Sequence, residues 1–188
     1  MDLNKAINIR HSARSFKIKK VPFELIIEAI DAAIKVPLAG NYNSLKFIIV
    51  TEQDAKSSLA KYADQNWISE ADTIVVLCSD AKKLKEVYGE RGSSYEKQQV
   101  GATIQNFLLR ITDLGLASCW VGAYLDDGVK RVLHVPEEIT IEAILPIGYE
   151  EKEAIGKRAR KPLLQDVIYW EKWNVKKKPN LFTEPRTM

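Results

Sequence analysis

Apolar residues recur with the most regular spacing between positions 99 and 126. In the first half of this stretch they return at steps of three and four, which predicts one buried helix that ends before Gly115. A glycine at that place closes a helix by taking the left-handed conformation. The expected buried positions are Val100, Ile104, Phe107, Leu108, Ile111 and Leu114. Small and apolar residues beside this stripe, such as Gly101 and Leu109, predict a helix covered on most sides, by its own sheet and, as one alternative, by a second subunit.

A short β-prone run, 118–124, follows this helix and is interrupted by Gly122. A glycine inside such a run is typical of a bulge or of a place where a flat group approaches the backbone. The plainer alternative is an ordinary helix-to-strand turn beside a core helix.

Shorter patterns predict the other helices. They are expected at 3–9, 22–36, 54–63 and 128–133. Asp2 is placed to cap the first helix, and Pro22 stands in the first turn of the second, where its missing N–H does no harm.

Strands are expected at 47–50, 73–78 and 139–148. The first two are continuous apolar runs, which favours sheet interior covered on both faces. Pro146 interrupts the third, and a proline belongs at a strand end or edge.

Periodicity weakens between positions 80 and 97. Residues that break it are Gly89, Gly92, Ser93 and Ser94. We therefore predict a mobile segment near the central helix that serves as a lid, with an idle surface loop as the alternative.

Composition is ordinary for one globular domain. The chain has 188 residues, of which 46% are hydrophobic and 28% charged. We predict one domain over 1–175 and an extended C-terminal arm over 176–188. The polar N-terminus and the lack of a long apolar span predict a cytoplasmic protein without a membrane segment.

Cysteine and histidine are scarce. Cys78 and Cys119 both lie in apolar runs, which argues against a disulfide framework or a metal cluster. The two histidines, His11 and His134, offer little material for a metal site or a Ser/His/Asp triad.

Positive charge is concentrated in a few places, although the net charge is only +3. Arg10, Ser12 and Arg14 offer two guanidinium groups and a hydroxyl within five residues, a set suited to a phosphate monoester. The basic runs 157–161 and 176–178 are typical of a solvated or nucleic-acid-facing surface. The alternatives are solvated surface charge for the arginine pair and a small nucleic-acid binder for the basic runs.

The loop 38–44 carries two amide side chains, Asn41 and Asn43. Such amides are able to pair with the polar edge of a heterocycle. A plain helix-to-strand loop is the alternative.

Several separated pieces together resemble one family. In chain order they are Arg10-His11-Ser12-Ala13-Arg14-Ser15-Phe16, Ala39-Gly40-Asn41-Tyr42-Asn43, Gly101-Ala102-Thr103-Ile104-Gln105-Asn106, Leu114-Gly115-Leu116-Ala117-Ser118-Cys119-Trp120-Val121-Gly122, Pro146-Ile147-Gly148-Tyr149 and Arg158-Ala159-Arg160-Lys161-Pro162. In order and spacing over residues 7–165 they resemble the FMN-dependent nitroreductase family. The resemblance implies an α+β fold with a central mixed, mainly antiparallel sheet flanked by helices. It also implies an intertwined homodimer with one FMN at each of two sites on the subunit interface.

The resemblance also implies a set of cofactor-binding residues. The expected phosphate ligands are Arg10, Ser12 and Arg14, together with Arg158 or Arg160, and His11 is a further expected cofactor-binding residue. Asn41 and Asn43 would face the pyrimidine edge or the ribityl chain of the flavin, the latter from the partner subunit. The backbone of Trp120, Val121 and Gly122 would lie beside the ring, with an N–H near Gly122 donating to flavin N5.

Two positions depart from the family pattern. Asn43-Ser44-Leu45 stands where relatives often have Gln-Pro-Trp, and Gln99 stands where many have an acidic residue. The first change puts the flavin contact of Asn43 in question, while the fold is expected to tolerate both.

The implied chemistry belongs to the cofactor. Electrons would pass from NADH or NADPH through FMN to a nitroaromatic, a quinone or a similar acceptor, so no catalytic side chain is required. The missing G-x-G-x-x-G motif agrees with this, because a nicotinamide that stacks transiently on a flavin needs no dinucleotide fold. The alternative is a flavin-binding sensor or carrier of the same fold with little turnover.

Overall fold

The computed structural model describes residues 1–151 and 162–177. It divides into two compact units, Met1–Ala154 and Ile155–Met188, and each is described here by itself. The predicted phosphate ligands Arg158 and Arg160, with the whole basic run 157–161, lie outside the described residues. The domain limits predicted at 175 and 176 stay a prediction.

A four-stranded antiparallel sheet forms the centre of the first unit. Its strands lie in the order β1-β2-β4-β3. Their bounds are β1 Leu45–Val50, β2 Thr73–Ser79, β3 Ala117–Ser118 and β4 Thr140–Gly148. The three longer strands confirm the apolar runs found in the sequence, and the α+β class is confirmed.

Strand β1 differs from its prediction. It lies at an edge of the sheet, and Phe47, Ile48 and Ile49 are only half-buried. The expectation of an interior strand covered on both faces was therefore wrong. A continuous apolar run reports low polarity on both faces of a strand and carries no information about its neighbours in the sheet.

Pro146 lies inside β4, an inner strand, and not at an end or an edge as predicted. Ala117 pairs with Gly148, and Val121 pairs with Ile144 by two backbone hydrogen bonds of 3.0 Å. In this register Cys119 stands opposite Pro146, at a position where a ladder bond is due. Because proline has no N–H, the ladder is interrupted there, and β3 ends at Ser118.

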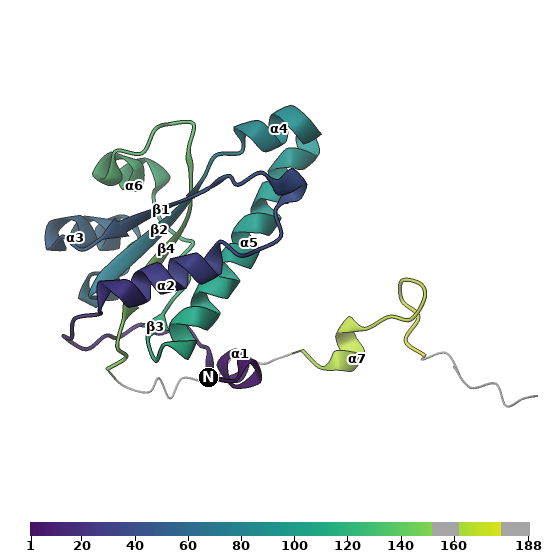
Figure 1. Ribbon diagram of the computed structural model, residues 1–188, viewed down its shortest axis with the longest axis horizontal. Coiled ribbons are helices and arrows are strands. Elements are labelled where there is room, and N and C mark those ends of the chain that lie inside the picture. The colour runs from purple at the N-terminus through teal and green to yellow at the C-terminus, as the bar shows by residue number, and fades with distance from the viewer. Residues whose placement is uncertain (152–161, 178–188) are drawn as a thin grey trace, which may run out of the picture. The chain divides into compact units, whose positions relative to one another are not determined.

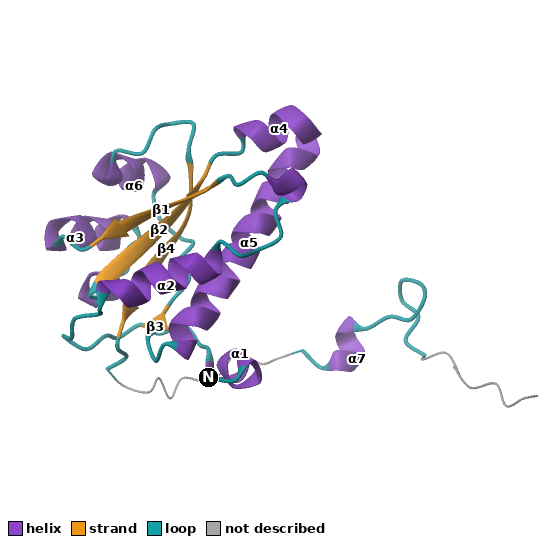
Figure 2. Ribbon diagram, viewed as in Figure 1, coloured by secondary structure: helices purple, strands orange, loops and turns teal. Residues whose placement is uncertain are grey.

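Helices cover both faces of the sheet (Figures 1 and 2). Helices α2 and α5 lie on one face, and α3 and α6 lie on the other. The helices of the first unit are α1 Leu3–Ile9, α2 Phe23–Ala33, α3 Gln53–Tyr62, α4 Lys82–Tyr88, α5 Glu90–Asp113 and α6 Asp126–Leu133, with 3₁₀ turns η1 Ala39–Asn41 and η2 Asn66–Glu70. Asp2 caps α1 as predicted, because its carboxylate accepts from the N–H of Asn4.

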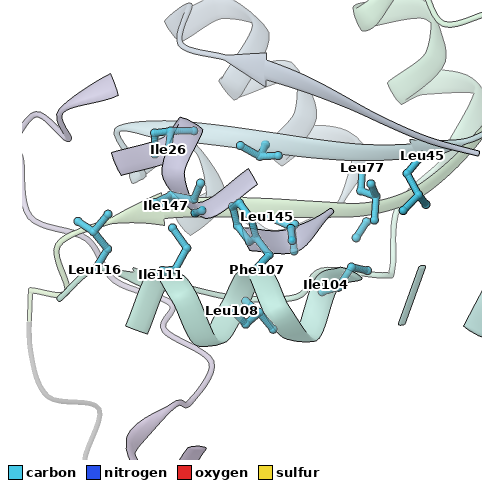
Figure 3. Packing of buried hydrophobic residues seen from close by; sticks show 14 of the residues in the cluster. Ile26, Leu45, Leu77, Ile104, Phe107, Leu108, Ile111, Leu116, Leu145 and Ile147 are labelled. Atoms are coloured by element: carbon cyan, nitrogen blue, oxygen red, sulfur yellow. The ribbon is translucent and has the colours of Figure 1, made fainter. Parts of the chain in front are cut away.

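The main core lies between α5, α2 and the sheet (Figure 3). Phe107, Ile104 and Ile111 of α5 are fully buried against Leu77 of β2 and Leu145 of β4. This arrangement confirms the helical stripe predicted from the sequence. Gly115, with φ of +74°, confirms the predicted end of the helix.

The segment 80–97 is helical, so the predicted glycine-rich lid was wrong. Helix α5 begins at Glu90, ten residues before Val100, where the apolar stripe starts, and α4 precedes it. Gly89, with φ of +56°, makes the turn between the two helices. A Cβ on Gly92 would overlap the backbone of Leu84, so this glycine allows α4 and α5 to approach closely. Of the glycines that break the pattern, Gly92 therefore allows close packing and Gly89 makes a turn.

The second unit contains a short helix, α7 Leu164–Val167, followed by an aromatic turn. The rings of Tyr169 and Trp173 lie 4.7 Å apart, and the Lys176 ammonium lies 4.3 Å from the centre of the Tyr169 ring. None of the described helices combines the length and the apolar composition needed to cross a membrane.

Replacement of Gly92 by alanine tests the contact between α4 and α5. We expect Gly92→Ala to lower the free energy of unfolding by about 1–3 kcal/mol, because a methyl group has no room beside Leu84. Urea unfolding followed by circular dichroism measures this. Ser94→Ala on the same helix is the control, since Ser94 is exposed. Equal stabilities of the two variants would contradict the close approach.

Candidate functional site

The segment after α1 joins two strands of the sheet. The Ala13 N–H donates to the Ser118 carbonyl over 3.1 Å, and the Lys17 N–H donates to the Tyr149 carbonyl over 2.8 Å. Phe16 forms an isolated antiparallel bridge with Glu150. The arginine-bearing segment 10–16 is therefore fixed by backbone bonds both to β3 and to the residues that follow β4.

Two buried side chains anchor this segment. Ala13 and Phe16 pack with Ala71, and the Phe16 ring lies 6.4 Å from the Trp67 ring. An added Cβ on Gly148 would lie 2.8 Å from Phe16, so only a glycine leaves room for the ring at the end of β4. Because Ala13 and Phe16 point inward, the polar side chains between and before them remain accessible.

Three of the predicted phosphate ligands gather at the turn after α5. The Ser12 hydroxyl and the charges of Arg14 and Arg10 lie close enough to the Cys119 thiol to act on it. Burial raises the pKa of Cys119, while Arg14, Ser12 and Arg10 act in the opposite direction. The structure thus brings together two stretches that are more than a hundred residues apart in the sequence.

A buried hydroxyl belongs to Ser118, the residue before Cys119. Ser118 is 4% exposed, its carbonyl accepts from Ala13, and its Oγ has no hydrogen-bond partner among the described residues. An unpartnered buried hydroxyl is costly unless a ligand or water pairs with it. The two guanidinium groups and the Ser12 hydroxyl near Cys119 are a donor set that fits a phosphate group.

His11 is directed toward protein partners. Its Nδ1 lies 3.0 Å from the Ile9 carbonyl oxygen, and its Nε2 lies 2.9 Å from both carboxylate oxygens of Glu150. Neither ring nitrogen is left for a ligand in this arrangement, and the role of His11 as a cofactor-binding residue stays a prediction.

The turn 119–122 presents backbone to its surroundings. Val121 is buried and uses both its N–H and its carbonyl for Ile144. Since successive amides of an extended chain point to opposite sides, the N–H of Gly122 points away from β4. Trp120 is 43% exposed, and no atom lies within 4 Å of a Cβ added to Gly122. Packing within this chain therefore does not require a glycine at position 122.

The loop 38–44 is braced by Gln99 of α5. The buried Gln99 amide accepts from the Ala39 N–H over 2.6 Å and donates over 3.4 Å to both the Tyr42 carbonyl and Ser44 Oγ. Only an amide can accept and donate in this way, whereas a carboxylate has no donor. Sequence analysis missed this role, although a polar residue at the edge of an apolar stripe was its signal.

The two asparagines of the loop differ in their availability. Asn43 Oδ1 accepts from the Leu45 N–H over 2.9 Å, so its amide oxygen is used within the loop. Asn41 is exposed and has a left-handed backbone with φ of +60°. Both asparagines are exposed, and of the two it is Asn43 whose side chain is held within the loop.

The loop and the arginine segment lie far apart within one chain. Gln99 holds the loop, while α1, which leads into the arginines, lies at the C-terminal end of α5, where the N-terminal amine pairs with Asp113. Sixteen residues separate Gln99 from Gly115, which is roughly 24 Å along a helix. The predicted site residues therefore form two separate groups, at the two ends of α5 (Figure 1).

A pocket of about 430 Å³ lies elsewhere, between α3 and the start of α6. It is lined by Tyr62, Tyr124, Leu125, Asp126, Asp127, Gly128 and Arg131. None of the predicted site residues lines it, and its two aspartates disfavour a phosphate. No group of histidine, cysteine and acidic residues suited to a metal ion occurs within 1–151 or 162–177.

The fold and the site define an α+β protein that gathers cationic and hydroxyl donors beside an open backbone turn. The sequence model of the nitroreductase family, described as "Nitroreductase family", matches residues 7–72 and 58–149. The chain therefore belongs to the nitroreductase family, a family of oxidoreductases.

Individual relatives agree with this assignment. A protein of Methanothermobacter thermautotrophicus, provisionally named NADH dehydrogenase/NAD(P)H nitroreductase, is 29% identical over 178 residues, covering 92% of this chain and 88% of the relative. The iodotyrosine deiodinase of Thermotoga neapolitana is 23% identical over 158 residues, with 76% and 85% covered. The crystal structure of the NADPH:FMN oxidoreductase of Vibrio harveyi, complexed with NAD+, superimposes with a TM-score of 0.80 at 19% identity, over 95% of this chain and 80% of that one. This structural likeness supports the fold.

Replacement of Gln99 by leucine tests the brace on the loop 38–44. Gln99→Leu should lower the free energy of unfolding by about 1–3 kcal/mol, because the Ala39 N–H loses its acceptor. Amide hydrogen exchange at Ala39 should also become faster. The exposed Gln98→Leu is the matched control and should change stability by less than about 0.5 kcal/mol. Unchanged exchange at Ala39 in Gln99→Leu would argue against the brace.

Proposed function

We propose that this protein is an FMN-dependent oxidoreductase that passes electrons from NADH or NADPH to a nitroaromatic, a quinone or a similar acceptor. The observation that carries the proposal is the convergence of Arg10, Ser12 and Arg14 on Cys119, in the turn after α5. The name of the Methanothermobacter relative and that of the Vibrio harveyi enzyme support a nicotinamide donor and a flavin.

In this proposal the phosphate of FMN is held by Arg10, Ser12 and Arg14. A phosphate monoester carries nearly two negative charges at neutral pH, and guanidinium groups bind such a dianion with paired N–H donors. Arg158 and Arg160 stay predicted further ligands from outside the described residues. The outward N–H of Gly122 is the proposed donor to the flavin ring.

When bound, FMN supplies the redox chemistry by accepting and releasing a hydride equivalent. The residues of this chain bind it, orient it and exclude water. The thiol nearest the site supports this division, because burial raises the pKa of Cys119 and keeps it a poor nucleophile.

A homodimer accounts for the two separate groups of site residues. If two copies of α5 pack side by side in opposite directions, the start of one helix lies beside the end of the other. The loop 38–44 of one subunit then reaches the arginine segment of its partner, which a single chain cannot achieve over roughly 24 Å. Leu109 and Gly101, half-buried in the single chain, are on the helix that would form this contact.

An absorbance spectrum of the purified protein, followed by stopped-flow reduction, tests the proposal. We expect a bound flavin that NADH or NADPH reduces rapidly and that a nitroaromatic or a quinone reoxidises. A flavin that binds but resists reduction by both nicotinamides would instead identify a sensor or carrier. A colourless protein that takes up no added FMN would end the flavin assignment.

Removal of the two arginines tests the phosphate anchor. Arg10→Ala with Arg14→Ala should weaken FMN affinity about tenfold or more, since each charge-assisted hydrogen bond is worth about 1.5–3 kcal/mol. Affinity is measured by quenching of flavin fluorescence. Riboflavin, which lacks the phosphate, should bind wild type and variant alike.

The exposed pair Lys61→Ala and Arg131→Ala, on α3 and α6 at the face of the sheet opposite α5, is the matched control, because it removes the same total charge. Its FMN affinity should stay within about twofold of wild type, since exposed charges beyond a Debye length are screened. Equal losses in both double variants would mean that net charge, and not the anchor, governs binding.

A further inference from the structure

His11 is held between two hydrogen-bond acceptors. Nδ1 lies 3.0 Å from the backbone oxygen of Ile9, and Nε2 lies 2.9 Å from each carboxylate oxygen of Glu150. A backbone carbonyl and an ionised carboxylate accept hydrogen bonds and do not donate them. Both bonds exist together only when both ring nitrogens carry a proton, that is, when His11 is an imidazolium.

The surroundings of the ring favour this charged form. The pKa of His11 is raised above its ordinary value of 6.5, first by the bond to the Ile9 carbonyl and next by the bond to Glu150. Arg10 acts against it, and Glu150 and Arg10 are the charged groups that bear on the ring among the described residues. The side chain of His11 is 42% exposed and that of Glu150 is 16% exposed, so protons reach the pair from solvent.

The pair joins the two segments on which the arginine cluster depends. His11 lies between Arg10 and Ser12, while Glu150 follows β4 and bridges to Phe16. A bond between them holds the start of the arginine segment against the end of the sheet, whereas Phe16 holds its other end.

We propose that His11 and Glu150 form a proton-dependent clasp that positions Arg10, Ser12 and Arg14, so that binding of a phosphate monoester at this segment weakens when His11 loses its proton. This inference rests on the proposed function for the identity of the ligand as FMN. His11 is thereby a positioning residue. It affects binding by fixing the segment that carries Arg10, Ser12 and Arg14.

The sign of the pH dependence follows from the charges. Below about pH 6.5 the imidazolium and the carboxylate neutralise each other and both bonds are made. As the pH rises through the raised pKa of His11, one bond is lost and Glu150 remains as an uncompensated negative charge near the anion site. Affinity for a phosphate, and the part of the folding stability that the clasp contributes, therefore decrease as the pH rises.

The imidazole titration tests the clasp without any ligand. The chain has two histidines, so NMR should detect two titrating rings, and His134→Asn assigns them. Asparagine suits this position, because His134 has a left-handed backbone at the end of α6. We expect His11 to titrate above 6.5 in wild type and at a lower pH in Glu150→Gln, because the bond to Ile9 remains while the carboxylate is lost. Titration of wild-type His11 at or below 6.5 would overturn the clasp.

Glu150→Gln also distinguishes a role of the clasp in positioning the arginine segment from a role in folding alone. A glutamine amide can donate to Nε2 of a neutral ring whose Nδ1–H still bonds Ile9, so this variant keeps the clasp at every pH. Its FMN affinity should equal that of wild type at pH 6.5 and stay constant to pH 8.5. Wild-type affinity should fall about two- to fivefold over the same range, as expected for a partly exposed pair.

Matched variants complete the test. Glu150→Ala, which has no side-chain partner for His11, should bind FMN more weakly than wild type already at pH 6.5, and His134→Asn should keep the wild-type profile. Ratios to wild type at each pH cancel the titration of the FMN phosphate itself. An unchanged pH slope in Glu150→Gln would overturn the clasp. If wild type binds no FMN at any pH, the proposed function fails, and the imidazole titration still decides whether the clasp exists.

Discussion

The structure depends on the packing of one face of α5 against the sheet. Phe107, Ile104 and Ile111 fill the space above β2 and β4, and α2 closes the same core from the side. Because this helix is 24 residues long, one group of predicted site residues lies toward each of its ends. Its burial therefore fixes the separation of the two groups, and the proposed homodimer is what would bring them together.

Much of this frame could be predicted from the sequence, because the relevant signals are local. The three- and four-residue spacing of α5, its closing Gly115 and the cap at Asp2 depend on a few neighbouring residues. The segment 80–97 was misinterpreted because Gly92 serves a contact with Leu84 on another helix. The edge position of β1 was missed for a related reason, since strand order depends on the whole chain.

The candidate site was predictable to a different degree. Arginines and a hydroxyl at close spacing indicated a phosphate, and the resemblance to a family linked them to the turn at 119–122. The brace formed by Gln99 and the pairing of His11 with Glu150 could not be predicted, because each joins residues more than fifty positions apart. Hydrogen bonds of this kind leave no period in the sequence and become visible only once the backbone has brought the partners together.

Pro146 has a consequence for what this sheet can accept. A residue with an amide hydrogen at 146 would let the pairing between β3 and β4 run on without a break from Ala117 to Val121. The main-chain groups of Cys119 would then be hydrogen-bonded within the ladder. Because Pro146 has no N–H to donate, that hydrogen bond is missing and the turn stays out of the sheet. The main-chain groups of this turn are thus left available for hydrogen bonds outside the sheet.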